Sequence, residues 1–276
     1  RQDQITRRPP FVETADGTRL AYRDWGSGQP VLFLHSLGVN SELWAYQMAD
    51  LLDHGYRCVA FDRRGHGRSS DPGRGYDADT LADDVAAVME TLNLRGAVLV
   101  GHSMAGGEIV RYLNRHGSSR VAKAVLVAPT TPFVLKTADN PKGVDPIMFE
   151  ATEAAWRKDF PKWVSDHAAP FFVPETSPEM VRWGVHMLTQ IPLLVQLACN
   201  RVVTDTDYRS DLKAIRIPTL VVHGDLDASA PLELTGRPTA EMIPGARLLV
   251  YEGAPHGLML THTGRLNADL REFISE

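Results

Sequence analysis

The sequence predicts an α/β fold in which helices cover both faces of a mostly parallel, eight-stranded sheet and a helical cap is added to it. Short apolar runs alternate with amphipathic stretches along most of the 276 residues. Such alternation is typical of a parallel sheet that is buried on both sides. Between residues 132 and 212 the alternation stops and the pattern is helical. We therefore predict a core domain of residues 1–131 and 213–276 and a cap domain of residues 132–212.

The first two strands are predicted as a hairpin, because Asp16-Gly17 lies between two β-type runs at residues 11–14 and 19–25. Six further strands are expected at residues 31–34, 56–61, 97–100, 121–128, 218–223 and 247–251. The helices between them are expected at residues 42–53, 79–92, 104–116, 234–243 and 263–274. In open sheets of this kind, ligands bind outside the carboxyl ends of the strands. We therefore expect the functional side chains at that edge.

One turn at that edge carries a serine between small residues. Ser103 lies where the strand at 97–100 gives way to the helix at 104–116, which Gly117 is expected to end. A turn this tight holds the serine at strained dihedral angles and exposes its hydroxyl above the sheet. Glycine is usual two residues before and after such a serine; here the first is Gly101, but the second position is Ala105, one methyl larger. The turn predicts a nucleophile.

Two later loops supply the partners that a serine nucleophile needs, in the expected order of acid and then histidine. His256 follows the strand at 247–251 and would accept the Ser103 proton, while a carboxylate would orient its ring. Asp225 and Asp227 both follow the strand at 218–223. Asp225 can simply make a turn with nearby amides. Asp227 lies further into the loop and can reach the histidine, so we favour Asp227 as the acid.

The loop after the strand at 31–34 is expected to stabilise a developing oxyanion. Such a site needs N–H groups aimed at the oxygen, and the backbone amides of Leu37 and Met104 are the predicted donors. Met104 also opens the helix after the nucleophile, where the helix dipole is positive. His35 in the same loop is interpreted as a structural histidine that bonds loop carbonyls.

With these motifs the chain resembles the α/β-hydrolase superfamily, and more narrowly its bacterial arylesterases, cofactor-free haloperoxidases or perhydrolases, and related γ-lactamases. The segments that carry the resemblance are Phe61–Ser70, Gly101–Met104 and Gly253–Leu258, and the match extends over nearly the whole chain. It implies the same triad and oxyanion donors. Two positions depart from the family pattern: Ser36 replaces the usual glycine, and Gly38 replaces the proline that is common in perhydrolases. The departures favour water over peroxide, and the loop looks like that of enol-lactone hydrolases.

The predicted cap contains more large apolar side chains than a surface excursion needs. Each of them can simply pack the cap onto the core, but as a set they would line an apolar acyl or aryl pocket. A helix is expected to begin at Ser177-Pro178, with a capping serine and a proline in its first turn. The predicted pocket residues are Trp156, Trp163, Phe171, Trp183 and Met187.

Composition argues against several other classes of protein. The net charge is −5 and the basic residues are scattered, so we expect no nucleic-acid partner. Apolar runs fall short of the roughly 20 residues that span a bilayer, so we expect no membrane partner. The first ten residues contain no apolar signal core, and two isolated cysteines suggest a reducing compartment, so a cytoplasmic location is expected. A homo-oligomer is compatible with the sequence.

Two further motifs are not interpreted as binding sites. Residues 62–67 are rich in glycine but lack the lysine and hydroxyl residue that end a nucleotide-binding loop, so they are interpreted as a turn. His223, Asp225 and Asp227 can ligate metals, yet no second cluster with ligand spacing accompanies them. We therefore predict no metal and no organic cofactor.

The sequence hypothesis is a serine hydrolase that cleaves small or medium carboxylic esters, acyl or aryl, through an acyl-enzyme on Ser103. The same triad could instead open a lactone or a γ-lactam, with perhydrolase or haloperoxidase activity as a side reaction. A hypothesis from another class is a silent ligand receptor on a hydrolase scaffold. Epoxide hydrolysis and dehalogenation are disfavoured, because relatives that perform them attack with aspartate at the position of Ser103.

Overall fold

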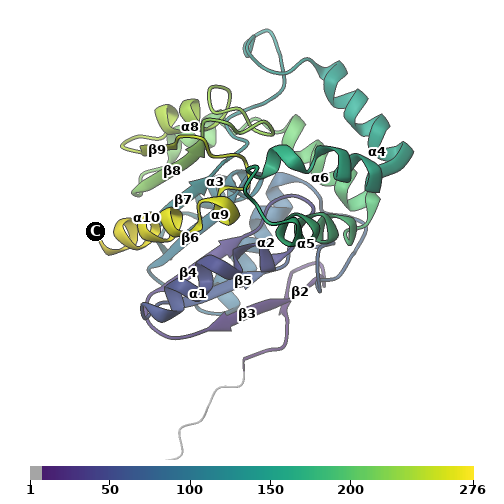
Figure 1. Cartoon of the computed structure of the whole chain (residues 1–276). Helices are drawn as coiled ribbons and strands as arrows, with labels where there is room; N and C mark the ends of the chain where they lie inside the picture. The colour runs from purple at the N-terminus through teal and green to yellow at the C-terminus, as the bar shows by residue number, and fades with distance from the viewer. Residues whose placement is uncertain (1–7) are drawn as a thin grey trace, which may run out of the picture.

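Seven strands form one sheet in the computed structural model, which describes residues 8–276 (Figure 1). Their spatial order is β3-β5-β4-β6-β7-β8-β9, and β3 runs antiparallel to β5 while the other neighbours are parallel. The strands are β3 (Tyr22–Trp25), β4 (Pro30–Leu34), β5 (Arg57–Phe61), β6 (Ala97–His102), β7 (Val121–Val127), β8 (Thr219–Gly224) and β9 (Arg247–Tyr251). The expected mostly parallel α/β fold is thus confirmed.

The strand side chains alternate between two apolar layers, as the period of two in a strand requires. Val31 and Phe33 of β4 face one layer and Leu32 and Leu34 face the other. The first layer is covered by α1 (Ala45–Asp53) and α10 (Thr263–Ser275), and the second by α2 (Ala78–Thr91), α3 (Ala105–His116) and α8 (Gly236–Met242). Two short elements complete the core, the 3₁₀ turn η1 (Ser41–Trp44) and the helix α9 (Leu258–Thr261).

The expectation of eight strands in the sheet was wrong by one, because the predicted strand at 19–25 is divided. Its first part, β2 (Arg19–Leu20), pairs with β1 (Val12–Glu13) in a separate two-stranded sheet, and its second part is β3. At the break, the Ala21 N–H donates to the Ser69 hydroxyl at 2.9 Å instead of to a strand. The polar loop after β5 therefore separates the hairpin from the sheet.

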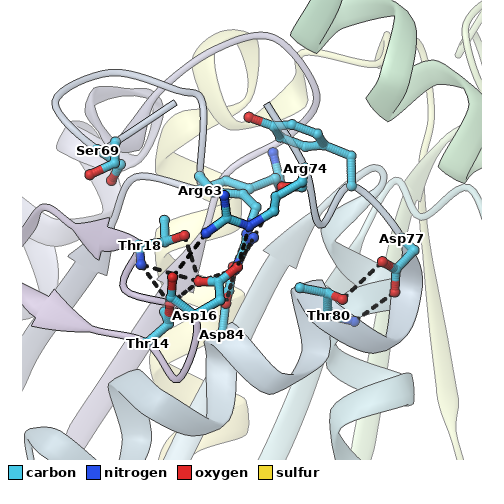
Figure 2. A network of polar contacts seen from close by, with 12 residues as sticks. Thr14, Asp16, Thr18, Arg63, Ser69, Arg74, Asp77, Thr80 and Asp84 are labelled. Atoms are coloured by element: carbon cyan, nitrogen blue, oxygen red, sulfur yellow. Dashed lines mark hydrogen bonds and ion pairs between the residues drawn. The ribbon is translucent and has the colours of Figure 1, made fainter. Parts of the chain in front are cut away.

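A buried arginine, Arg64, fastens that hairpin to the core; Figure 2 shows Thr14, Asp16, Thr18 and Asp84 of the network around it. The Arg64 guanidinium donates two hydrogen bonds of 2.7 Å to Asp84 of α2 and one of 2.9 Å to Asp16 of the hairpin turn. Asp16 also accepts hydrogen bonds from the hydroxyls of Thr14 and Thr18, each at 2.7 Å. These contacts join three segments that are far apart in the chain, so the role of Arg64 here is structural.

The insertion between β7 and β8 forms the helices that lie over the carboxyl ends of the strands. The Ser177 hydroxyl accepts from the Met180 N–H at 3.1 Å, so this helix starts where the sequence predicted. The longest helix is kinked at Asp159, two residues before Pro161, because proline cannot continue the hydrogen-bond ladder. The elements over this edge are α4 (Pro146–His167), η2 (Ala169–Phe171), α5 (Pro178–Thr189) and α6 (Leu193–Asp205), while α7 (Arg209–Ala214) packs against α3 in the core.

The structure also bears on the expected free cysteines and on the expected absence of a membrane-spanning segment. Both cysteines, Cys58 and Cys199, are buried and free. Across residues 8–276, none of the helices combines the length and the apolar composition needed to cross a bilayer.

Candidate active site

Ser103 occupies the turn between β6 and α3 with a backbone φ of 58°. This left-handed conformation is uncommon for residues other than glycine. The turn is held by the Ser103 N–H, which donates to the Val127 carbonyl of the neighbouring strand at 3.0 Å, and by the Gly106 N–H, which donates to the Ser103 carbonyl at 3.0 Å. The strain is therefore maintained by backbone hydrogen bonds on both sides of the serine.

Small residues around Ser103 are required by close packing. A methyl group on Gly101 would lie 2.7 Å from Ile109 and 3.1 Å from the Ala105 side chain. A side chain at position 101 would therefore require Ile109 and the start of α3 to shift, whereas the structure accommodates the extra methyl of Ala105. This explains why the departure at position 105 leaves the turn intact.

Ser103, His256 and Asp227 are connected by two hydrogen bonds. The His256 Nδ1 lies 2.6 Å from the Asp227 Oδ2, and its Nε2 lies 3.0 Å from the Ser103 Oγ. A carboxylate can only accept, so Nδ1 carries the proton and Nε2 accepts the hydrogen bond from the serine hydroxyl. All three residues are at most 7% exposed. The arrangement thus places a basic nitrogen next to the hydroxyl of a residue whose backbone is strained.

The Asp227 carboxylate has further partners that fix it and favour its charged form. Its Oδ1 accepts from the backbone amides of Ser229 and Ala230, at 2.9 and 2.7 Å. Burial would raise the pKa of Asp227, but the electrostatic interaction with the His256 ring and the hydrogen bonds from His223, His256 and the Ala230 N–H outweigh it. The pKa of Asp227 therefore lies well below its ordinary value.

The two candidate aspartates play different structural parts. The Asp225 carboxylate accepts a hydrogen bond of 2.8 Å from the Gly253 N–H, which is the turn-forming contact that the sequence suggested. Asp227 is the one that contacts His256. Of the two, the geometry therefore offers Asp227 as the partner of the histidine.

Two buried histidines also surround this group, and the sequence did not predict their contacts. His102 Nε2 donates to the His256 carbonyl at 2.9 Å, and the two rings lie 4.5 Å apart. Burial and the neighbouring His256 hold the pKa of His102 well below its ordinary value, so the ring is neutral. His223 donates to the Ala230 carbonyl at 2.7 Å and lies 3.2 Å from Asp227. His102 and His223 therefore support the loops that carry His256 and Asp227.

The two amides predicted as oxyanion donors have no acceptor within the described part of the chain. Neither the Leu37 N–H nor the Met104 N–H takes part in the hydrogen bonds of residues 8–276. Met104 is the N-cap residue of α3, where the helix dipole is positive. His35 Nδ1 donates to the Ser36 carbonyl at 2.7 Å, the structural part expected of it. Two N–H groups near the serine are thus available to an oxygen.

A cavity of about 260 Å³ opens beside Ser103 and His256. Apolar side chains of the core and of the insertion form most of its wall. All five predicted pocket residues line it: Trp156, Trp163, Phe171, Trp183 and Met187. Leu37 and Leu43 contribute from the core. The cavity therefore joins the strained serine to an aromatic pocket.

Several residues of the cavity wall were missed by the sequence analysis. Phe160 and Val164 line it together with Trp156, each four residues after the previous one on α4. Residues spaced by four lie on one face of a helix, so this spacing was a usable signal. Gln196 also lines the cavity, but no such signal in the sequence points to it, because its place in the wall depends on contacts with residues far away in the chain. No group of three or more metal-ligating side chains is found in residues 8–276.

Comparison with known proteins identifies the family. Residues 29–180 match the model of the α/β-hydrolase fold family. The chain belongs to this family, and the family and its esterase members support a hydrolase enzyme.

Relatives of known name cover almost the whole chain. A non-heme chloroperoxidase of Kitasatospora aureofaciens is 39% identical over 97% of this chain and 100% of that protein. A bifunctional esterase/perhydrolase of Acinetobacter calcoaceticus is 37% identical over 96% of this chain and 99% of its own length. The solved structure of an esterase from Exiguobacterium antarcticum superposes with a TM-score of 0.93 at 31% identity, covering 96% of this chain and 99% of that one.

The strain at Ser103 predicts a difference between two small substitutions. Ser103→Ala and Ser103→Gly both remove the hydroxyl, but only glycine relieves the left-handed conformation, which costs other residues about 1–2 kcal/mol. Glycine also loses about 0.4–1 kcal/mol through the flexibility of the unfolded chain. We expect the glycine variant to be the more stable by about 1 kcal/mol in urea unfolding. An alanine variant of equal or higher stability would contradict a strained turn.

Proposed function

We propose that this protein hydrolyses carboxylic esters through an acyl-enzyme on Ser103. The observation that carries the proposal is the hydrogen-bonded series of Ser103, His256 and Asp227 beside two unpaired N–H groups. His256 would accept the serine proton as the hydroxyl attacks the ester carbonyl, and would then deliver it to the leaving alcohol. Asp227 would hold the ring and stabilise its charged form. In the second half of the reaction, His256 would take a proton from water as the water attacks the acyl-enzyme, and would then return the proton to Ser103 as the acid leaves.

The oxyanion of each tetrahedral intermediate would be stabilised by the Leu37 and Met104 N–H groups. Donors that are already oriented need no rearrangement when the charge develops, and removal of one such donor typically costs about 10²–10³ in kcat. Because the Met104 N–H opens α3, the helix dipole adds to its effect. These groups supply the part of catalysis that the triad itself does not.

The cavity supports small or medium esters with an aryl or acyl group as substrates. Its wall is mainly aromatic and aliphatic, with Trp156, Trp163 and Phe171 among its members. Apolar pockets of a few hundred Å³ hold most of a small ligand and leave orientation to a few polar groups. A lactone or γ-lactam presents the same carbonyl chemistry and belongs in the same substrate panel.

Peroxide is a second acceptor for the proposed acyl-enzyme, since the relatives include a chloroperoxidase and an esterase/perhydrolase. In that reaction hydrogen peroxide takes the place of water and releases a peracid, which oxidises halide. The loop that carries Leu37 differs from perhydrolases at Gly38, whose φ of +77° is closed to proline. This supports water as the preferred acceptor.

The first test is covalent labelling. A fluorophosphonate should form one adduct, which mass spectrometry should place on Ser103, and Ser103→Ala should lose both the adduct and the hydrolysis of aryl esters. A panel of aryl esters, lactones and lactams then ranks the substrates. An active Ser103→Ala variant would refute the acyl-enzyme. A chain that binds such compounds and neither turns them over nor takes up the label would be a receptor.

The second test separates the two aspartates. Asp227→Asn should lower kcat by about 10⁴, because an amide neither stabilises the charged imidazole nor selects its tautomer. Asp225→Asn is the matched control, since it lies two residues away and its carboxylate bonds the Gly253 amide instead. Its kcat should change by less than about tenfold. Steady-state kinetics on one aryl ester measures both, and the opposite ranking would transfer the acid role to Asp225.

The third test concerns peroxide. In carboxylate buffer with peroxide and bromide, halogenation should be slow compared with ester hydrolysis, should need Ser103 and should survive dialysis against a chelator. The reason is that the peracid would come from the acyl-serine, so no redox centre takes part. Bromination of a dye gives the rate. Halogenation that persists in Ser103→Ala, or hydrolysis that returns only when a metal is added, would refute this scheme.

A further inference from the structure

Arg63 lies under the loop that carries the Leu37 N–H. Its side chain is 3% exposed, and its guanidinium donates to the carbonyls of both His35 and Ser36, the latter at 3.1 Å. The Arg63 backbone N–H donates to the ring of His35 at 2.9 Å. One residue thus bonds the two peptide groups that precede Leu37.

The same guanidinium is paired with the helix that carries the other proposed donor. Its Nε donates to Glu108, whose side chain is 2% exposed. Glu108 lies in the first turn of α3, four residues after Met104. Arg63 and Glu108 therefore join the loop with the Leu37 N–H to the helix that begins after the Met104 N–H.

The peptide groups of Gly38, the residue after Leu37, are also bonded. The Gly38 N–H donates to His66 Nε2 at 3.2 Å, and the Gly38 carbonyl accepts from Gln196 at 3.4 Å. His66 Nδ1 lies 2.9 Å from the Arg64 carbonyl, so that nitrogen carries the proton and Nε2 is free to accept. The amide of Leu37 thus lies between peptide groups that are held by Arg63 on one side and by His66 and Gln196 on the other.

We propose that Arg63 and Glu108 are positioning residues of the active site, which fix the spacing between the Leu37 and Met104 N–H groups. This proposal rests on the ester hydrolysis proposed above. A buried ion pair costs about as much desolvation as its attraction returns, so stability alone is a poor reason for it. Its value lies in geometry, because the rigid fork of arginine bonds two carbonyls and a carboxylate at once.

The neighbouring residue Arg64 provides an internal comparison. Its side chain is 1% exposed and paired with the buried Asp84, so it matches the Arg63–Glu108 pair in burial and charge. Its other side-chain bonds go to Asp16 and to the Arg74 carbonyl. Two consecutive arginines thus form two buried pairs, and only the first contacts the loop of Leu37.

The test compares Glu108→Ala with Asp84→Ala. Glu108→Ala leaves Arg63 without a carboxylate and Asp84→Ala leaves Arg64 with Asp16 alone, so both should unfold at lower temperature than the unsubstituted chain. At a temperature where both are folded, Glu108→Ala should lower kcat on an aryl ester by about tenfold or more and leave KM within about twofold. Asp84→Ala should keep kcat within about twofold. Glu108→Gln should recover most of kcat, because its amide oxygen still accepts from Arg63.

Arg63→Lys keeps the test decisive where Glu108→Ala does not fold. Lysine keeps the positive charge next to Glu108 but lacks the fork that bonds two carbonyls. Its kcat should fall like that of Glu108→Ala. The rate of labelling by a fluorophosphonate should fall in parallel, since the phosphoryl oxygen uses the same donors.

The outcomes distinguish this proposal from the proposed function. Turnover that survives Ser103→Ala refutes both. Turnover that depends on Ser103 but is unchanged in Arg63→Lys and Glu108→Ala refutes the positioning role alone. The same holds if Asp84→Ala loses as much kcat as Glu108→Ala, because the loss would then follow stability. A kcat loss confined to the Arg63 and Glu108 variants supports the proposal.

Discussion

The tight turn at Ser103 is the constraint on which the surrounding structure depends. It reverses the chain from β6 into α3 within a few residues, and the helix then lies against neighbouring segments with little space. A methyl group on Gly106 would lie 3.0 Å from Pro129, and one on Gly107 would lie 2.4 Å from the ring of Tyr208. These glycines allow α3 to begin at the sheet edge, which fixes both the serine and the Met104 amide.

Around this turn many buried polar groups bond to neighbours, while the Nδ1 atoms of His102 and His223 and the Gln196 Oε1 have no partner in the described part of the chain. His35, His66, His102 and His223 each bond a backbone carbonyl. An unpaired buried donor is costly, about 1–3 kcal/mol, so most are satisfied within the protein. The Leu37 and Met104 amides have no acceptor in residues 8–276. Since Arg63, His66 and Gln196 bond the peptide groups next to Leu37, the placement of its amide is a property of the fold.

Much of this arrangement could be predicted from local patterns. Short apolar runs fixed the places of β4 to β9, and the residues that follow three of them, Ser103, Asp227 and His256, came together as expected. The division of the strand at 19–25 was not predictable, since Ala21 and Leu20 look like strand residues. What divides them is the Ser69 hydroxyl, 48 residues away in the chain.

The supporting residues escaped prediction for the same reason. Arg63 lies in a glycine-rich turn and Glu108 in an amphipathic helix, where charged residues are normally exposed. Their burial follows from the packing of α3 against the loop after β5, which no local pattern reports. Gln196 of α6 is similar, because its amide is placed by the carbonyls of Gly38 and Leu188.

The insertion is bonded directly to the loops of the active site at two points. Gln196 donates to the Gly38 carbonyl beside Leu37, and the Phe171 carbonyl accepts from the Gly257 N–H beside His256 at 3.0 Å. A methyl group on Gly257 would lie 2.5 Å from that carbonyl, so the approach is close. A wide opening of the insertion would break both contacts. The segments that form the aromatic pocket therefore also hold the loop with Leu37 and the loop with His256, so a change in the shape of the pocket would move the Leu37 amide and the His256 ring.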